Sequence, residues 1–212
     1  MFNIDKYREI KGFLNKTSKN TKIIAISKNH PKESVNEALN AGVRIFGENR
    51  VLEAKKKFTE IKSQYPEIEL HLTGPLQSNK VKEAISIFDV FHTLDREKIA
   101  KEFNKSVEKI TNKQFFIQVN TGEEKTKSGV SPKETDDFIN FCKSEMGLNV
   151  IGLMCIPPIN DHPRNHFELL EKLSHKNNLS KLSIGMSNDY QEAIKFKPSY
   201  IRLGTVLFGK RN

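Results

Sequence analysis

The chain has 212 residues, 36% of them hydrophobic, and this length suits one globular domain with a substantial core. No segment is apolar enough to cross a bilayer, and the N-terminal residues lack the apolar core of a signal peptide, so no membrane partner is expected. The formal net charge of +9 comes mostly from lysines scattered over predicted helices, with few arginines, so we expect no nucleic-acid partner.

An N-terminal helix is expected at about residues 3–17, followed by eight apolar segments that each precede a helical pattern. Short strands alternating with helices indicate βαβ units and a parallel sheet. Eight such steps predict a single (β/α)8 TIM barrel, with the extra N-terminal helix, as one domain over residues 1–212. A doubly wound open sheet is the alternative, because a strand count does not show closure. The expected strands are residues 21–27, 43–49, 68–74, 89–94, 114–120, 149–157, 181–187 and 199–209.

Capping residues support these divisions. Ser131 and Glu134 have the spacing of a capping box, with a proline between them at the first helical position. Asp95 is expected to cap the helix after the fourth strand. Pro31 is expected to open the helix that stops near Gly42.

Lys28 ends the first apolar strand, on the same face as Ile24 and Ile26. A partly desolvated amine in this position favours its neutral, nucleophilic form, which a Schiff-base lysine needs. The alternative is a lysine whose stem lies along the strand end while its amine reaches water. This segment alone favours the alternative, but polar residues at the other strand ends favour a functional site.

The seventh and eighth strands end in residues suited to an anion. Ser187 precedes a helix whose expected cap is Asn188, so its hydroxyl and the following backbone N–H groups would face a phosphate. Gly204 and Thr205 add close backbone approach and a second hydroxyl. Barrels frequently bind phosphate after strands seven and eight, although Ser187 and Thr205 could equally be ordinary turn and strand residues.

Arg202 shares a face with Tyr200 and Gly204, which we assign to the barrel interior. A buried guanidinium needs an acceptor. One candidate is the ring nitrogen of a pyridine cofactor, which an arginine keeps unprotonated and a weak electron sink. The alternative is a salt bridge to an interior carboxylate, Glu48 or Glu69.

The remaining cysteines and histidines suggest no metal site. Cys142 and Cys155, expected in a helix and a strand, belong to no CxxC motif, so free thiols and a cytoplasmic location are expected. His162 and His166 are spaced as one helix face but lack a third ligand, and a surface pair is favoured.

Several motifs occur in an order that closely resembles the pyridoxal phosphate homeostasis proteins, the YggS/PROSC family. The resemblance runs from about residue 20 to the C-terminus. Its motifs are AISKNHP, FGENRVLEA, GPLQSNK, the KSG of residues 127–129, GLMCIPP, LSIGMSNDYQEAI and YIRLGTVLFG.

The resemblance implies a barrel like the N-terminal domain of alanine racemases, the fold type III of enzymes that use pyridoxal 5′-phosphate (PLP). PLP would form a Schiff base with Lys28, with Arg202 near its pyridine nitrogen. The other residues that the resemblance assigns to the cofactor are Asn49, His71, Met154, Ser187, Gly204 and Thr205. Lys127 would be a second PLP contact or a residue at the mouth of the site.

The chain departs from the family pattern at three places. Asn29-His30 follows Lys28, where the family commonly has a second lysine, which puts any role for such a lysine in doubt. Leu70 stands where a tryptophan usually precedes the strand-three histidine, and Asn188-Asp189 replaces a pair of aspartates. None of these changes removes a group that PLP binding needs.

The resemblance implies intracellular PLP homeostasis: a carrier and buffer, expected as a monomer, that binds PLP and related B6 vitamers and supplies apo-enzymes. A racemase needs a second base from a β-domain, and we expect none because the chain ends shortly after Gly209. We therefore expect no robust catalysis. The alternatives are a weak PLP-dependent amino-acid racemase, a cofactor-free lysine lyase, and a ribosome-associated or nucleic-acid-binding module.

Overall fold

Eight parallel strands form the centre of the molecule, and the computed structural model describes residues 1–209 of the chain. The strand order is sequential, and β1 pairs with β8 through four residue pairs, including Ile24 with Arg202, so the sheet is a closed barrel. The predicted (β/α)8 barrel is confirmed, and the open-sheet alternative is wrong. The strands are β1 Lys22–Ile26, β2 Ile45–Glu48, β3 Glu69–Leu72, β4 Val90–Leu94, β5 Gln114–Gln118, β6 Val150–Met154, β7 Lys181–Ser183 and β8 Tyr200–Leu203.

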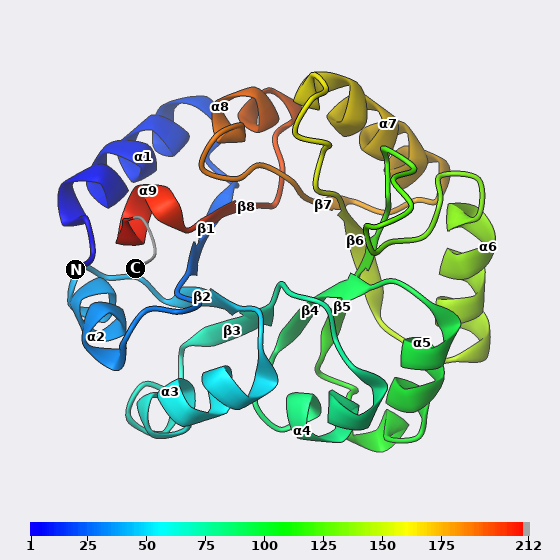
Figure 1. Ribbon diagram of the computed structural model, residues 1–212, viewed down its shortest axis with the longest axis horizontal. Coiled ribbons are helices and arrows are strands. Elements are labelled where there is room, and N and C mark those ends of the chain that lie inside the picture. Colours follow the sequence, from blue (N-terminus) through cyan, green and yellow to red (C-terminus); the bar gives the residue numbers. More distant parts are fainter. Residues whose placement is uncertain (210–212) are drawn as a thin grey trace.

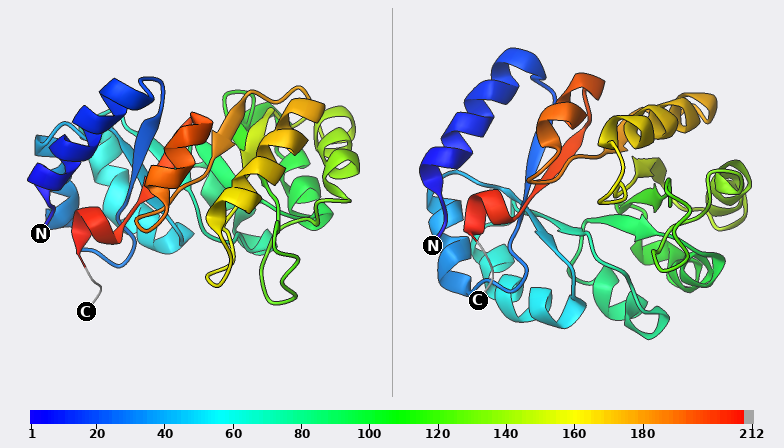
Figure 2. Two further views of the ribbon diagram at one scale, coloured as in Figure 1. Left: turned by 90° about the horizontal axis from the view of Figure 1, so that it is seen from above. Right: turned by 45° about the horizontal axis from the view of Figure 1, so that its top comes forward.

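Helices surround the barrel as an outer ring (Figure 1). They are α1 Ile4–Thr17, α2 Lys32–Asn40, α3 Val51–Gln64, α4 Val81–Ile85, α5 Glu97–Asn104, α6 Thr135–Asn140, α7 Pro163–Lys176, α8 Tyr190–Ala193 and α9 Thr205–Phe208. Short 3-10 turns lie at Ser78–Lys80, Val107–Lys109 and Ile194–Phe196, and a π-helical turn at Phe141–Glu145 extends α6. The loops after β5 and β6 project from the same side of the barrel as α9 (Figure 2).

Every strand is shorter than its apolar run, and the last one differs most. The strand expected over residues 199–209 ends at Leu203, because the chain turns at Gly204 and continues as α9. The seventh ends at Ser183, before Gly185 adopts a φ of +88°. An apolar run indicates that residues are buried, not that their backbone is extended. Residues that follow a strand can therefore stay buried beneath the helices after the strand has ended.

Two of the three capping predictions need correction. Ser131 and Glu134 do form their reciprocal bonds, since the Glu134 N–H donates to the Ser131 Oγ at 3.3 Å and the Ser131 N–H to the Glu134 carboxylate at 3.4 Å, but α6 begins only at Thr135. Asp95 does not cap α5. It pairs with Arg96 at 2.5 Å, and Arg96 itself occupies the N-cap position in an extended conformation.

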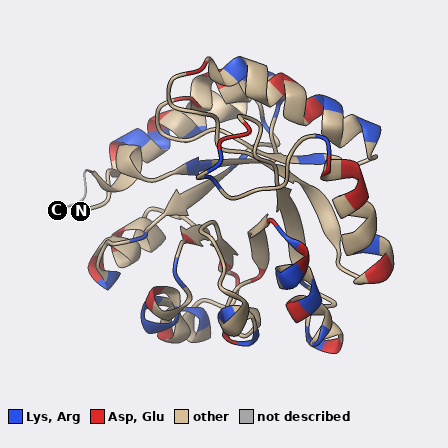
Figure 3. Ribbon diagram, turned by 45° about the vertical axis from the view of Figure 1, so that its right-hand side comes forward, with Lys and Arg blue, Asp and Glu red and all other residues tan. Residues whose placement is uncertain are grey.

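The hydrophobic core has two layers. The larger fills the space between the strands and the helical ring. The smaller lies inside the barrel and consists of Ile24, Ile26, Val90, Phe116, Met154 and Tyr200. Blue and red segments interleave along the outer helices (Figure 3), as expected for lysines scattered over a solvated surface. Within residues 1–209, no helix is long and apolar enough to span a membrane.

Candidate functional site

Four neighbouring strands carry predicted site residues at their carboxyl ends. Lys28 lies two residues after β1, and Asn49 directly follows β2. Ser187 lies in the loop after β7, while Gly204 and Thr205 follow β8. Because β7, β8, β1 and β2 are consecutive around the barrel, these residues lie along one arc of the barrel edge at which the strands end. We call this arc the rim.

A hydroxyl and backbone donors meet where the loops after β7 and β8 approach each other. The Ser187 Oγ accepts a hydrogen bond of 3.3 Å from the backbone N–H of Val206, in the first turn of α9. Thr205, which begins α9, is exposed. This arrangement offers hydroxyl and N–H donors to an anion.

The helix cap predicted beside Ser187 is wrong. Asp189, not Asn188, occupies the N-cap position of α8, which begins at Tyr190. Its carboxylate accepts from the backbone N–H of Met186 at 2.5 Å, which tightens the loop and leaves Asn188 exposed. Burial raises the pKa of Asp189, and that hydrogen bond opposes the rise.

Arg202 is buried and bonded to the barrel itself. One terminal nitrogen donates to the carbonyl and the hydroxyl oxygen of Ser183 at 2.6 and 2.7 Å, and the other donates to the Cys155 carbonyl at 2.9 Å. Neither Glu48 nor Glu69 forms the salt bridge considered from the sequence. Burial lowers the pKa of Arg202, but a guanidinium stays protonated in proteins. These bonds use at most three of its five donors, so the others remain for a ligand.

A chain of hydrogen-bonded side chains crosses the barrel interior from the half-buried Glu69 to the buried Arg202. His92 Nδ1 lies 2.9 Å from the Ser183 Oγ, and His92 Nε2 lies 2.7 Å from His71 Nδ1. His71 Nε2 in turn lies 2.8 Å from a carboxylate oxygen of Glu69. We call Glu69, His71, His92, Ser183 and Arg202 the buried chain.

The ends of the buried chain fix its direction. Arginine only donates and a carboxylate only accepts, so each intermediate group donates toward Glu69. His92 and His71 therefore both carry their proton on Nε2. Burial lowers the pKa of both histidines, which keeps both rings neutral, and the hydrogen bond from His71 lowers the pKa of Glu69.

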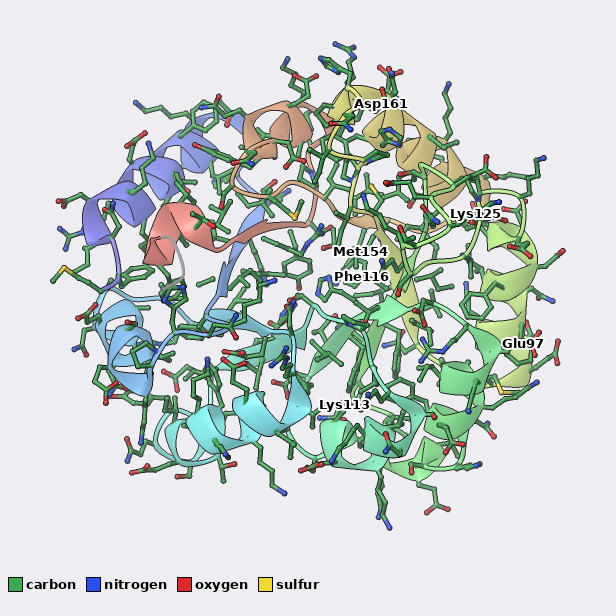
Figure 4. The ribbon with its side chains drawn as sticks, in the orientation of Figure 1. Glu97, Lys113, Phe116, Lys125, Met154 and Asp161 are labelled. Carbon is green, nitrogen blue, oxygen red and sulfur yellow. The ribbon has the colours of Figure 1, made fainter. Side chains whose placement is uncertain are left out.

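Two of the predicted cofactor residues lie inside the barrel. His71 is fully buried, with both ring nitrogens bonded within the buried chain. Met154, the last residue of β6, packs in the inner core beside Phe116, near the barrel centre (Figure 4). Their position allows them to support a ligand from the barrel interior.

Asn49 lies in the closest approach between the loops after β2 and β3. The Thr73 hydroxyl donates to the Asn49 side-chain oxygen at 3.0 Å. A Cβ on Gly74 would lie 2.5 Å from the Asn49 carbonyl oxygen, so only glycine fits there. This packing fixes the position of Asn49 at the rim.

A second buried cluster lies outside the barrel, beneath the turn that carries Lys28. Lys57 of α3 pairs with Glu48 at 2.6 Å and with Glu53 at 2.9 Å. We call these three residues the Lys57 cluster. Burial raises the pKa of Glu48, while Lys57 opposes the rise. Burial also acts against ionisation of Glu53, but hydrogen bonds from Lys57 and from the Asn29 backbone lower its pKa.

Sequence reasoning missed the central residues of both clusters, although signals were present. His92 alternates with Val90 along β4, which places both inside the barrel. Lys57 stands in a run of three lysines that we counted as solvated. Its spacing from Ala54 and Ile61 nevertheless matches the buried face of α3.

The remaining candidates from the sequence are a histidine, a lysine and the two cysteines. His166, expected on the surface, is buried, with its ring nitrogens 3.0 Å from the Thr121 hydroxyl and from Asp161. Lys127 pairs with Glu124 at 2.6 Å. Cys142 and Cys155 are free, and burial raises the pKa of each to about 12. No group of three or more metal-ligating side chains occurs among residues 1–209.

Comparison with known proteins finds strong similarity over nearly the whole chain. The family model of the alanine racemase N-terminal domain matches residues 5–212. A pyridoxal phosphate homeostasis protein of Aquifex aeolicus is 38% identical over 200 residues, covering 90% of this chain and 87% of its own.

Solved structures share the fold. PipY of Synechococcus elongatus, determined without and with PLP bound, superposes with TM-scores of 0.87 and 0.85 at 29% identity, over 97% of this chain and 99% of its own. An alanine racemase of Acinetobacter baumannii gives a TM-score of 0.75 at 16% identity, over 97% of this chain and 61% of its own. This last likeness concerns the barrel alone.

Proposed function

The chain belongs to the family of pyridoxal phosphate homeostasis proteins, and from that membership we propose that it binds PLP reversibly and buffers it in the cytoplasm. The observation that carries the proposal is the rim. There, four consecutive strand ends bring a lysine together with hydroxyl and backbone N–H donors, and the buried guanidinium of Arg202 lies within the adjoining strand β8. PipY, which has been solved with PLP bound, supports it. The two free, buried thiols fit a reducing compartment.

The donors of the rim suit the phosphate group. Ser187 and Thr205 would hold the phosphate through their hydroxyls, and Gly204 would allow it to approach the first backbone N–H groups of α9. Charge-assisted hydrogen bonds from such donors are stronger than neutral ones. Asn49 would contact the cofactor from the neighbouring loop.

The barrel interior suits the pyridine ring. Arg202 would donate to the ring nitrogen, and the buried chain behind it supplies the acceptors that hold the guanidinium in place. When bound, PLP supplies an aldehyde that condenses with amines and a ring that withdraws electrons. A guanidinium at the ring nitrogen keeps that nitrogen unprotonated, which weakens the withdrawal. Met154 and His71 would support the ring from below.

Lys28 would hold the aldehyde as a Schiff base, and an amine competitor or an apo-enzyme would take the cofactor away. The exposure of Thr205 and Asn188 suits exchange across an open rim. We propose a monomeric carrier that supplies apo-enzymes, without robust catalysis of its own. Lys127 lies in the loop after β5 and would act at the mouth of the site.

Borohydride reduction after incubation with PLP, followed by peptide mapping, tests this function. A single phosphopyridoxyl group on Lys28, lost in Lys28→Ala, is the expected result. Labelling spread over surface lysines, or unchanged PLP binding in Lys28→Ala, would contradict it. Steady racemisation of alanine that depends on Lys28 would instead favour the enzyme.

A further inference from the structure

We propose that Lys57 is a positioning residue for Lys28: its ammonium group holds the turn that presents the Lys28 amine to PLP. The inference rests on the proposed function and extends it to a residue outside the barrel. Lys57 belongs to α3, and its side chain is 9% exposed. The two lysines before it in the sequence are exposed.

Lys28 occupies the second position of a tight turn. The backbone N–H of His30 donates to the Ser27 carbonyl at 3.1 Å, which closes the turn over residues 27–30. Asn29, at the third position, has a φ of 61°, in the left-handed region that asparagine tolerates better than most residues. One hydrogen bond within the chain closes this turn, and its other contacts come from outside it.

Lys57 supplies those contacts from beneath the turn. Its Nζ lies 2.7 Å from the Ser27 carbonyl oxygen and 3.2 Å from the His30 carbonyl oxygen. It also lies 2.6 Å from a Glu48 oxygen and 2.9 Å from a Glu53 oxygen, so the three donors of the ammonium are shared among four acceptors. One cation therefore joins the two ends of the turn to two carboxylates.

Those carboxylates hold the turn as well. A Glu53 oxygen accepts from the Asn29 backbone N–H at 2.5 Å, and Glu48 accepts from the Ser27 hydroxyl at 2.7 Å. The residues on both sides of Lys28 are therefore anchored through the Lys57 cluster. The second oxygen of Glu48 is buried without a hydrogen-bond partner among residues 1–209, so Glu48 depends on Lys57 for compensation.

A fixed turn matters because the covalent step needs alignment. The Lys28 nitrogen attacks the PLP aldehyde carbon, a carbon–nitrogen double bond forms, and the carbonyl oxygen leaves as water. Misplacement of a reacting group by about 1 Å can lower a reaction rate a hundredfold. The free energy needed to bring a loose Lys28 turn into place would also lower the affinity for PLP. Binding of the phosphate and the ring does not require this alignment.

Two ligands distinguish a positioning role of Lys57 from a general loss of structure in the variant. Pyridoxine 5′-phosphate has the ring and phosphate of PLP but no aldehyde. We expect Lys57→Met to weaken PLP binding by up to about a hundredfold while leaving pyridoxine 5′-phosphate binding unchanged. Lys56→Met, the same substitution on the preceding exposed residue, should change neither. In the ligand-free protein, amide hydrogen exchange over residues 27–30 should accelerate only in Lys57→Met.

A double variant keeps the test decisive if Lys57→Met folds poorly. Glu48→Gln combined with Lys57→Met removes the uncompensated charge but leaves the Ser27 carbonyl without its donor, so PLP binding should stay weak. Full recovery of PLP binding in the double variant would overturn the inference, as would equal losses for both ligands. Absence of a Lys28 adduct in the unaltered protein would instead overturn the proposed function.

Discussion

The buried chain inside the barrel and the Lys57 cluster outside it are similarly removed from solvent, but they differ in charge. His71, His92 and Ser183 are fully buried and uncharged, and only the ends of their chain, Glu69 and Arg202, carry charge. The Lys57 cluster instead packs one cation against two carboxylates. One region holds Arg202 with hydrogen bonds to uncharged acceptors, and the other holds the Lys28 turn with ion pairs.

This difference has a physical consequence. In the buried chain Ser183, His92 and His71 each donate to the next group, so these three neutral side chains are satisfied at neutral pH. In the Lys57 cluster one Glu48 oxygen has no partner within the described part of the chain, and the cluster is stable only while the cation is present. Breaking a buried ion pair costs more than breaking a neutral hydrogen bond, because an uncompensated charge remains.

Lys57→Met should therefore have the largest effect on stability. We expect the free energy of unfolding at pH 7 to fall by about 3–5 kcal/mol, because Glu48 is left as a buried, unpaired carboxylate. Urea unfolding measures this loss. Glu48→Gln in the same variant should restore part of it, and Lys55→Met on the exposed face should stay within about 0.5 kcal/mol. Additive losses for Glu48 and Lys57 would show that the pair is not coupled.

Interruption of the buried chain should lower the free energy of unfolding by less than Lys57→Met does. His92→Phe keeps a ring that can stack on Phe116, whose ring centroid lies 4.5 Å from that of His92, but leaves His71 Nδ1 without its donor and the Ser183 hydroxyl without its acceptor. We expect a loss of about 2–4 kcal/mol from two unsatisfied polar groups. Glu69→Gln, which keeps an acceptor for His71, should cost less in the same urea titration. An equal or larger loss in Glu69→Gln would contradict the assigned direction of the chain.

The sequence predicted the parts of this comparison that depend on local patterns. Strand alternation placed Arg202 and Tyr200 inside the barrel, and the strand-end rule brought Lys28 and Ser187 to one rim. Both predictions need only the period of a strand and the direction of a parallel sheet.

The clusters themselves could not be predicted in this way. His92 meets Ser183 across 91 residues, a contact that exists only because the barrel closes. Lys57 meets Ser27 and His30 only when α3 packs against the barrel at β2, beside the turn that follows β1. A lysine in a run of lysines also has no composition signal that distinguishes a buried cation from a solvated one. Closure and helix packing, rather than periodicity, created these sites.

The pH dependence of stability should separate the two regions. Burial lowers the pKa of His71 and His92 from the ordinary 6.5, so the unfolded chain binds more protons than the folded one as the pH falls. The free energy of unfolding should therefore decrease below about pH 6.5, by up to about 1.4 kcal/mol per pH unit for each histidine. Urea titrations between pH 7 and pH 5 measure this slope, which should be smaller in His92→Phe.

Glu48 should affect the pH dependence of stability in the opposite direction to the two histidines. Its pKa is raised from 4.5, so the folded protein holds that proton more readily, and its contribution to the free energy of unfolding rises as the pH falls toward 4.5. Lys57→Met should therefore lose less stability at pH 5 than at pH 7. A loss that does not change with pH would contradict a charged Glu48 in the variant.

Thr205→Ala should have the smallest effect on stability, because Thr205 is exposed at the rim and belongs to neither cluster. The free energy of unfolding should change by less than about 0.5 kcal/mol. PLP binding should nevertheless weaken about tenfold, since a hydrogen bond to a charged phosphate is lost, whereas binding of pyridoxal, which has no phosphate, should not change. Equal losses for PLP and pyridoxal would place the phosphate elsewhere. We therefore expect stability and PLP affinity to change independently. The two clusters below the rim stabilise the fold, whereas Thr205 would contact only the ligand. Its substitution can therefore change affinity without changing the fold.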